Sequence, residues 1–121
     1  MRQTPTAVVE LNGDRIVTVR VRAGAAQSVS DAEKNLSAAL ELRNGERRPI
    51  LVDIRDAVPL EADVRRYYSG QVLVGFTCLA LLIKANPLGR MIGNIYLRIA
   101  NTGIPTRLFT DESAALQWLR N

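Results

Sequence analysis

Five charged or polar residues occur where two expected strands end and where the helices after them begin: Arg55, Asp56, Lys84, Asn86 and Arg90. In open sheets with parallel strands, ligands bind in the crevice beyond the carboxyl ends of the strands, where helix N-termini also point. Cations and free amides at that edge predict a site for a small anion, such as a phosphate, a carboxylate or a lipid head group. The alternative is that Lys84 ends a strand in solvent and Arg90 lies on an exposed helix face, because no glycine-rich loop accompanies them.

The residue types needed for common catalytic and metal sites are scarce. The chain has no histidine, which excludes Ser-His-Asp and Cys-His nucleophile systems and the usual zinc sites. The single cysteine, Cys78, lies in an apolar run and is interpreted as a small core residue rather than a reactive thiol. Asp53, Asp56 and Lys84 show no spacing tied to a specific reaction. We therefore expect no enzyme activity, no metal and no cofactor.

The net charge of the chain is modest. Sixteen lysine and arginine residues against twelve aspartate and glutamate residues give +4, and the basic residues are scattered. Nucleic-acid binding normally requires a dense basic patch, so we expect no nucleic-acid partner. No signal peptide is expected, and the longest apolar run, residues 72–83, is shorter than the roughly 20 residues that span a bilayer. We expect a soluble, cytoplasmic protein.

The first elements predicted to support these residues are the two strands of a hairpin. They flank Asn12-Gly13, a dipeptide that favours the positive φ angles of a tight turn. In the second strand, valines alternate with polar residues, which is typical of a strand with one face on the core. Arg20 and Arg22 are therefore interpreted as part of a solvated face or as edge protection.

A helix over about 30–44 and a central strand are predicted next. Ser30 with Glu33 three residues later is typical of a capped helix start. The run "PILVDIRD" that follows has the continuous apolar character of a strand covered on both faces. A buried Asp53 requires a partner, and Arg55 on the same side of the strand is the candidate. We interpret this pair as structural rather than catalytic.

A second helix is predicted to begin at Pro59, because proline is tolerated at the first helical position. The inward stripe of this helix is expected to comprise Leu60, Val64, Tyr67 and Tyr68. The run "TCLALLIK" is then limited to strand length by the glycine before it and the Asn-Pro pair after it.

A third helix is predicted to begin with Asn86 as its cap and Pro87 as its first residue, and to end at Thr102-Gly103. The residues expected to face inward are Leu88, Met91, Ile92, Ile95 and Ile99. Gly93 and Leu97 would then lie on the opposite side and form a contact surface, which is a homodimer seam, a partner groove or a weak membrane-touching patch. The alternative is that Leu97 is an isolated exposed leucine.

The chain closes with a short strand, "TRLFT", and a helix capped by Thr110, on which Trp118 acts as a lid over the core. The resulting order is β-β-α-β-α-β-α-β-α. Alternation of this kind predicts an α/β fold with a mixed, mostly parallel sheet of about five strands, an N-terminal hairpin and about four helices. We expect one domain over residues 1–121.

Three segments of the sequence resemble a known family. They are "LVDIRD", the helix start P-x-x-R-x-x-G-N at Pro87, Arg90, Gly93 and Asn94, and the ending "IPTRLFTDESAALQWL". Together they look like the STAS-like group related to sporulation anti-sigma-factor antagonists, often called SpoIIAA-like. The resemblance implies a sheet with helices packed on it and a non-enzymatic role in bacterial regulation, in which the domain binds another protein or a small ligand, sometimes at a membrane surface.

The better-characterised antagonists of that family carry a phosphorylatable serine or threonine after an aspartate that follows the central strand. The matching positions here are Arg55, Asp56, Ala57 and Val58, which offer no hydroxyl. One hypothesis is that Asp56 imitates a phosphorylated state, since a carboxylate near a helix N-terminus is favoured. The alternative is that Asp56 is an ordinary helix-start residue.

Two functions follow as expectations. The first is a regulatory protein-interaction module that forms a homodimer, binds a regulatory partner and lacks the usual phosphoacceptor. The alternative is a protein that binds a small anion or a lipid head group in the crevice at the strand ends.

Overall fold

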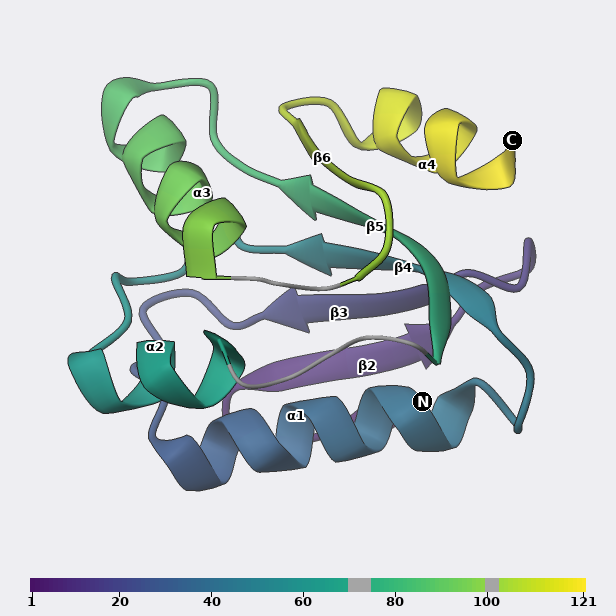
Figure 1. Cartoon of the computed structure of the whole chain (residues 1–121), viewed down its shortest axis with the longest axis horizontal. Coiled ribbons are helices and arrows are strands. Elements are labelled where there is room, and N and C mark those ends of the chain that lie inside the picture. The colour runs from purple at the N-terminus through teal and green to yellow at the C-terminus, as the bar shows by residue number, and fades with distance from the viewer. Residues whose placement is uncertain (70–74, 100–102) are drawn as a thin grey trace.

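The computed structural model describes residues 1–69, 75–99 and 103–121. In these residues one sheet holds six strands in the order β1-β2-β3-β4-β5-β6 (Figure 1). The strands are β1 (Arg2–Gln3), β2 (Ala7–Leu11), β3 (Val17–Val21), β4 (Arg48–Asp53), β5 (Phe76–Leu82) and β6 (Thr106–Phe109). The helices are α1 (Val29–Leu42), α2 (Ala62–Ser69), α3 (Pro87–Ile99) and α4 (Glu112–Arg120). Strands β1 to β3 pair antiparallel and β3 to β6 pair parallel. The predicted α/β fold is confirmed, and the short β1 is an additional strand.

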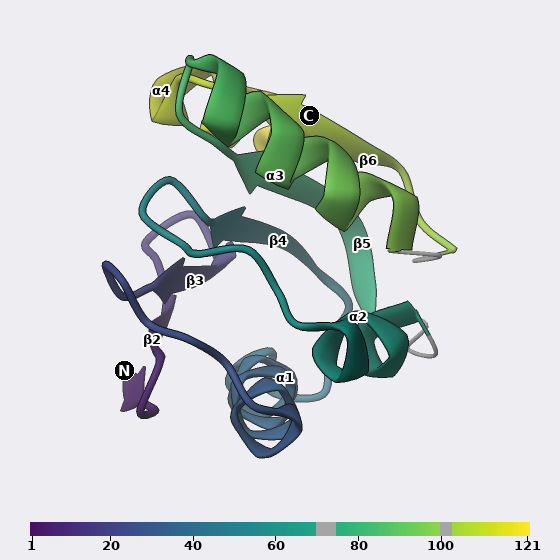
Figure 2. The same ribbon diagram turned by 90° about the vertical axis from the view of Figure 1, so that its left-hand side faces the viewer.

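Helices cover the two faces of the sheet unequally. One face packs against α1, α2 and α3, and it carries Ile50, Leu79 and Leu81. Of the described helices, only α4 packs against the other face, which carries Leu51 and Leu82. Successive side chains of a strand point to opposite faces, so the continuous apolar runs of β4 and β5 supply both cores. Figure 2 shows α1 and α2 beside the same side of the strands.

The hairpin forms where it was predicted, but its turn is longer. The connection runs from Asn12 to Ile16, and the Asn12 Oδ1 atom accepts hydrogen bonds from the amides of Asp14 and Ile16, each at 2.9 Å. The positive φ angle, 62°, belongs to Arg15 and not to the Asn12-Gly13 pair. The asparagine side chain therefore organises this turn.

Two helix starts also differ from the prediction. Ser28, not Ser30, caps α1, because Asp31 at the third helical position completes the reciprocal hydrogen bonds with it. Helix α2 begins at Ala62 rather than at Pro59. Between β4 and α2 the chain buries Ala57 and Leu60 in the core, and this packing outweighs the preference of proline for a first helical position.

Helix α3 begins as predicted but is rotated about its axis. Leu88 and Met91 were expected to face inward, yet they are 58% and 49% exposed, while Ile92 and Tyr96 are buried. Gly93 was expected to be exposed, but it faces the sheet: a Cβ atom there would lie 2.8 Å from Ile83 Cγ2. The prediction that Gly93 lies on the exposed side of the helix is therefore wrong.

The cause of the rotation is the close approach that glycine permits. An added Cβ at Gly89, one turn before Gly93, would overlap the carbonyl oxygen of Lys84. The helix thus places its two glycines against the end of β5, and the larger side chains turn away from the sheet. Leu97 is exposed, as predicted. The predicted end of the helix at Thr102 lies outside the described residues, and so does the side chain of Ile99.

Candidate functional site

At the carboxyl end of β4, four charged side chains join the sheet to α4. Arg55 donates to the two carboxylate oxygens of Asp53 from Nε at 3.0 Å and from Nη2 at 2.8 Å. Arg20 on β3 donates to Asp53 at 3.0 Å and to both carboxylate oxygens of Glu112 at 2.8 and 2.9 Å. Arg55 also reaches Glu112 at 3.3 Å. The predicted pair of Asp53 and Arg55 is confirmed, as part of a larger network.

The network keeps both of its carboxylates ionised. Burial acts to raise the pKa of Asp53, but hydrogen bonds from Arg55 and Arg20 outweigh it and hold that pKa below its usual value. The hydrogen bond from Arg20 likewise lowers the pKa of Glu112. Two guanidinium groups thus balance two carboxylates. Arg55, which was predicted to bind an anion, already has its charge compensated by these partners.

Arg20 and Arg22 were expected to lie on a solvated face: Arg22 is exposed, whereas Arg20 is only partly solvated. Its side chain lies between β4 and the first turn of α4, where it is 39% exposed. The alternation of valine and polar residues in β3 was interpreted as one buried and one open face. Helix α4, more than ninety positions away in the chain, covers the second face.

Three other residues predicted at this edge, Asp56, Lys84 and Asn86, form one ion pair and one helix cap. Lys84 Nζ lies 3.0 Å from Asp56 Oδ1, and both side chains are more than half exposed. Asn86 Oδ1 accepts a hydrogen bond from the Gly89 amide at 2.7 Å, which caps α3 as predicted. Asp56 lies in the loop before α2 and not at the N-terminus of that helix, so the geometry on which the phosphate-mimic hypothesis rests is absent from the described residues.

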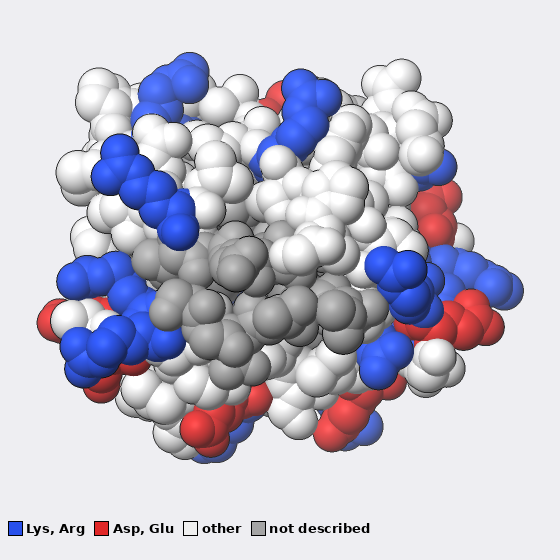
Figure 3. Space-filling model, viewed as in Figure 1, with Lys and Arg blue, Asp and Glu red and all other residues white. Residues whose placement is uncertain are grey.

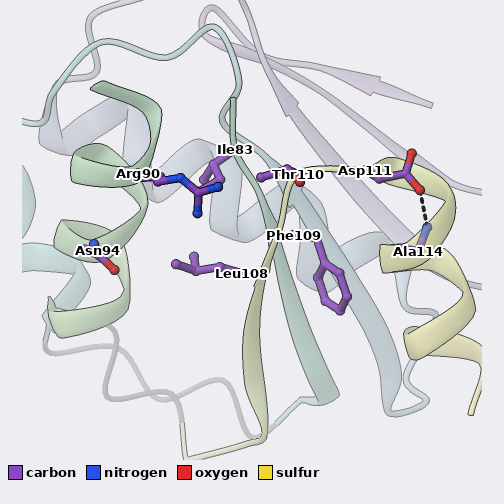
Figure 4. A pocket seen from close by; sticks show the side chains of 8 residues that line it. All are labelled: Ile83, Arg90, Asn94, Leu108, Phe109, Thr110, Asp111 and Ala114. Carbon is purple, nitrogen blue, oxygen red and sulfur yellow. Dashed lines mark hydrogen bonds between the residues drawn. The ribbon is translucent and has the colours of Figure 1, made fainter. Parts of the chain in front are cut away.

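Arg90 lies apart from Lys84, in a cleft between α3 and the start of α4. The cleft has a volume of about 330 Å³. Its lining residues are Ile83, Arg90, Asn94, Leu108, Phe109, Thr110, Asp111 and Ala114. Figure 4 shows Arg90 extending from α3 toward Thr110, with Asp111 beyond it at the start of α4. Lys84 and Arg90, predicted to act on one anion, therefore face different surroundings.

Asn94, Thr110 and Asp111 were not predicted as site residues. Thr110 was expected to cap α4, but Asp111 does so: its Oδ2 atom accepts from the Ala114 amide at 3.1 Å. The spacing Arg90-x-x-x-Asn94 places both residues on one helix face, so the sequence could have predicted Asn94 as a neighbour of Arg90. The proximity of that face to the β6–α4 connection follows only from the parallel pairing of β5 with β6.

The described residues show neither a concentrated basic patch on the face in view nor a metal-binding cluster. On the face seen in Figure 3, the described basic side chains are scattered and interspersed with acidic ones. Among residues 1–69, 75–99 and 103–121, no group of three or more acidic or cysteine side chains is placed to hold a metal ion. No helix in the described part of the chain is long and apolar enough to cross a bilayer.

The sheet order, the helices on both of its faces and the crevice at the strand ends define an α/β protein with a SpoIIAA-like fold. The chain belongs to the family described as a domain of unknown function, DUF7793, whose model matches residues 9–121. The fold is shared with the crystal structure of an uncharacterised DUF3478 protein with a SpoIIAA-like fold from Shewanella loihica PV-4. That structure matches with a TM-score of 0.64 and 16% identity, covering 98% of each chain.

A second solved structure is a protein of unknown function from Arthrobacter sp. FB24. It is 33% identical, covers 92% of this chain and 90% of its own, and has a TM-score of 0.36. None of the curated proteins matches the chain. The predicted SpoIIAA-like resemblance is thus confirmed at the level of the fold.

Proposed function

We propose that this protein is a non-enzymatic interaction module, and that α3 carries its contact surface. The observation that carries the proposal is a stripe of side chains along one face of α3, formed by Leu88, Met91, Ile95 and Arg98. These residues follow one another at steps of three, four and three, so they lie in line on the helix. Leu88 and Met91 are 58% and 49% exposed.

The composition of this α3 stripe favours a protein partner. Methionine and arginine are enriched at protein interfaces, whereas lysine, aspartate and glutamate are depleted. Helix α3 contains none of those three residue types. Full burial of a leucine or methionine side chain is worth about 1.5–3 kcal/mol, and a side chain that is already half buried gains roughly half of that when a partner covers it. A partner that covers these two side chains, which lie one turn apart, therefore gains free energy from the burial of apolar surface.

The charge of the α3 stripe specifies the partner further. Arg98 is exposed in the last turn of α3, and the helix carries no acidic residue to balance it. We therefore propose a partner protein that presents an apolar surface with an acidic side chain opposite Arg98. Residues 55–58 contain no hydroxyl group, so we propose no control of this contact by phosphorylation at those positions.

The test replaces the apolar centre of the stripe by charge. A photo-crosslinking residue at position 95 identifies the partner segment in the source cell, and binding of that purified partner is then measured by calorimetry. Leu88→Asp with Met91→Asp should abolish binding. Leu40→Asp is the matched control, because Leu40 is an exposed leucine on α1. Arg98→Glu should weaken binding, and replacing the partner's acidic residue by lysine should restore it.

Two results would overturn the proposal. One is undiminished binding by the double aspartate variant when its fold is intact by circular dichroism. The other is a homodimer in sedimentation velocity that dissociates in the same variant, since a second copy of the chain would then occupy the stripe in place of an acidic partner.

A further inference from the structure

We propose that the cleft between α3 and α4 binds a small monocarboxylate with a short apolar body. Its volume of about 330 Å³ lies at the lower end of the roughly 300–1,000 Å³ typical of small-molecule sites. The cleft opens at the carboxyl ends of β5 and β6, the edge at which open parallel sheets bind ligands. It shares no residue with the α3 stripe, so this site is independent of the proposed protein contact.

Arg90 supplies the main recognition group of the cleft. Its guanidinium points from α3 toward Thr110 (Figure 4), and it forms no hydrogen bond or ion pair with any residue that the structure describes. A planar guanidinium binds a carboxylate through two parallel hydrogen bonds. The amide of Asn94, one turn further along α3, and the hydroxyl of Thr110 line the same cleft and add two donors.

The backbone of β6 adds another donor to the wall of the cleft. The Ile83 amide donates to the Phe109 carbonyl at 2.8 Å, so Phe109 faces β5 in the parallel ladder. Leu108, the residue before it, turns its amide to the opposite edge. Since β6 is the last strand of the sheet, this amide has no strand partner among the described residues.

Part of the lining of the cleft is apolar. Ile83 and Leu108 both line the cleft. Gly93 brings α3 close to these side chains, since a Cβ atom at that position would lie 2.8 Å from Ile83 and 3.4 Å from Leu108. A short branched or linear hydrocarbon fits above them, whereas a long chain would leave the cleft.

Asp111 decides which anion the cleft selects. Its carboxylate caps α4 through the Ala114 amide, and its negative charge offsets the positive charge of Arg90 in the lining. Arg90 and Asp111 together carry no net charge, so a bound monoanion leaves one negative charge in the lining, and its ion pair with Arg90 outweighs its repulsion by Asp111. A dianion adds a second negative charge near Asp111 and is disfavoured by repulsion. The lining therefore favours a carboxylate over phosphate.

The experiment titrates the ¹⁵N-labelled chain with isovalerate and follows amide chemical shifts. We expect saturable shifts of the amides of Arg90, Asn94 and Thr110. Isovaleramide, which has the same shape without the charge, and inorganic phosphate should each bind at least about tenfold more weakly, because neither makes a balanced pair with Arg90. Equal binding of isovaleramide, or no saturable shift with isovalerate, would overturn the proposal.

Three variants assign the binding to this cleft. Arg90→Gln should weaken isovalerate binding at least about tenfold, whereas Arg98→Gln, on the same helix but outside the cleft, should leave it unchanged. Asp111→Asn keeps a good helix cap and should strengthen the binding of both isovalerate and phosphate. Leu88→Ala with Met91→Ala, which removes apolar surface from the stripe without adding charge near Arg90, should bind isovalerate normally, which separates this site from the protein contact. Unchanged binding by Arg90→Gln would show that the anion binds elsewhere.

Discussion

The two faces of the sheet are stabilised in different ways. On one face, α1, α2 and α3 bury an extended apolar core that includes Val64, Phe76 and Leu81. On the other face, α4 buries only a small cluster around Ala115 and Leu119. There, ion pairs from Glu112 to two arginines supplement the apolar contact.

The apolar cluster that holds α4 on the sheet is therefore smaller than the one that α1, α2 and α3 share. A small apolar contact provides less free energy of burial than a large one, and partly exposed ion pairs add little to it. Elements held by few buried contacts open in local unfolding events before the rest of the protein unfolds. One wall of the proposed carboxylate cleft is the start of α4, so the integrity of that cleft depends on the docking of α4.

The largest expected effect is on the three-helix face. Leu81 is 2% exposed, so Leu81→Ala leaves a cavity that the surrounding helices and strands cannot fill. We expect a loss of about 3 kcal/mol in the free energy of unfolding, measured by urea denaturation. Leu40→Ala, at an exposed position on α1, is the control and should change stability by less than about 0.5 kcal/mol. Equal losses in the two variants would contradict the burial described here.

The matching change on the α4 face should have a smaller and more local effect. Leu119→Ala should cost about 2 kcal/mol, because α4 can shift and partly close the cavity. Hydrogen exchange should accelerate in α4 while the amides of β4 and β5 stay protected. Equal acceleration of exchange in α4 and in the sheet would mean that the two faces unfold as one unit, which would contradict local unfolding of α4.

A third change tests the close approach of α3. Gly93→Ala should destabilise the protein by about 1–2 kcal/mol, because the added methyl group overlaps Ile83. Gly13→Ala is the control, since nothing lies within 4 Å of a Cβ atom at that position. Unchanged thermal stability of Gly93→Ala would mean that α3 packs farther from the sheet than described.

The smallest effect is expected for the ion network. The pKa values of Asp53 and Glu112 are lowered in the folded protein, so the network stabilises the fold above the usual carboxyl range near pH 4. This stability should be lost as the pH falls through the lowered pKa values. Glu112→Gln should cost less than about 1 kcal/mol near neutral pH.

The pH dependence supplies the measurement for that change. Stability should decrease less steeply with acid in Glu112→Gln than in the parent chain when denaturation is followed from neutral to acid pH. Asp14→Asn is the control, because Asp14 forms an exposed ion pair with Arg120. If the free energy of unfolding depended on pH in the same way in Glu112→Gln and in the parent chain, the Glu112 carboxylate would not contribute to the pH dependence.

Much of the fold could be predicted because local patterns specified it. The apolar runs of β4 and β5, the hairpin and the cap of α3 at Asn86 were all predicted from neighbouring residues. The start of α2 could not be predicted in this way. Pro59 is a good first helical residue, but burial of Leu60 in the loop depends on contacts with distant parts of the chain.

The candidate site was predictable only in part. The sequence placed Lys84, Asn86 and Arg90 at one edge of the sheet, and it suggested the partner of Asp53. It did not show that Lys84 pairs with Asp56 while Arg90 faces Thr110. These partners come from different elements, and side-chain pairing across elements is not encoded in the spacing along either one.

The class of fold could be predicted from the amino-acid sequence alone, because strand and helix periodicities depend on neighbouring residues and alternate along the chain. The rotation of α3, in contrast, depends on how the helix packs against the sheet. Its apolar residues are consistent with more than one inward face, and a hydrophobic pattern takes no account of the close backbone approach that Gly89 and Gly93 allow. That approach placed Leu88 and Met91 on the surface and Arg90 in the cleft.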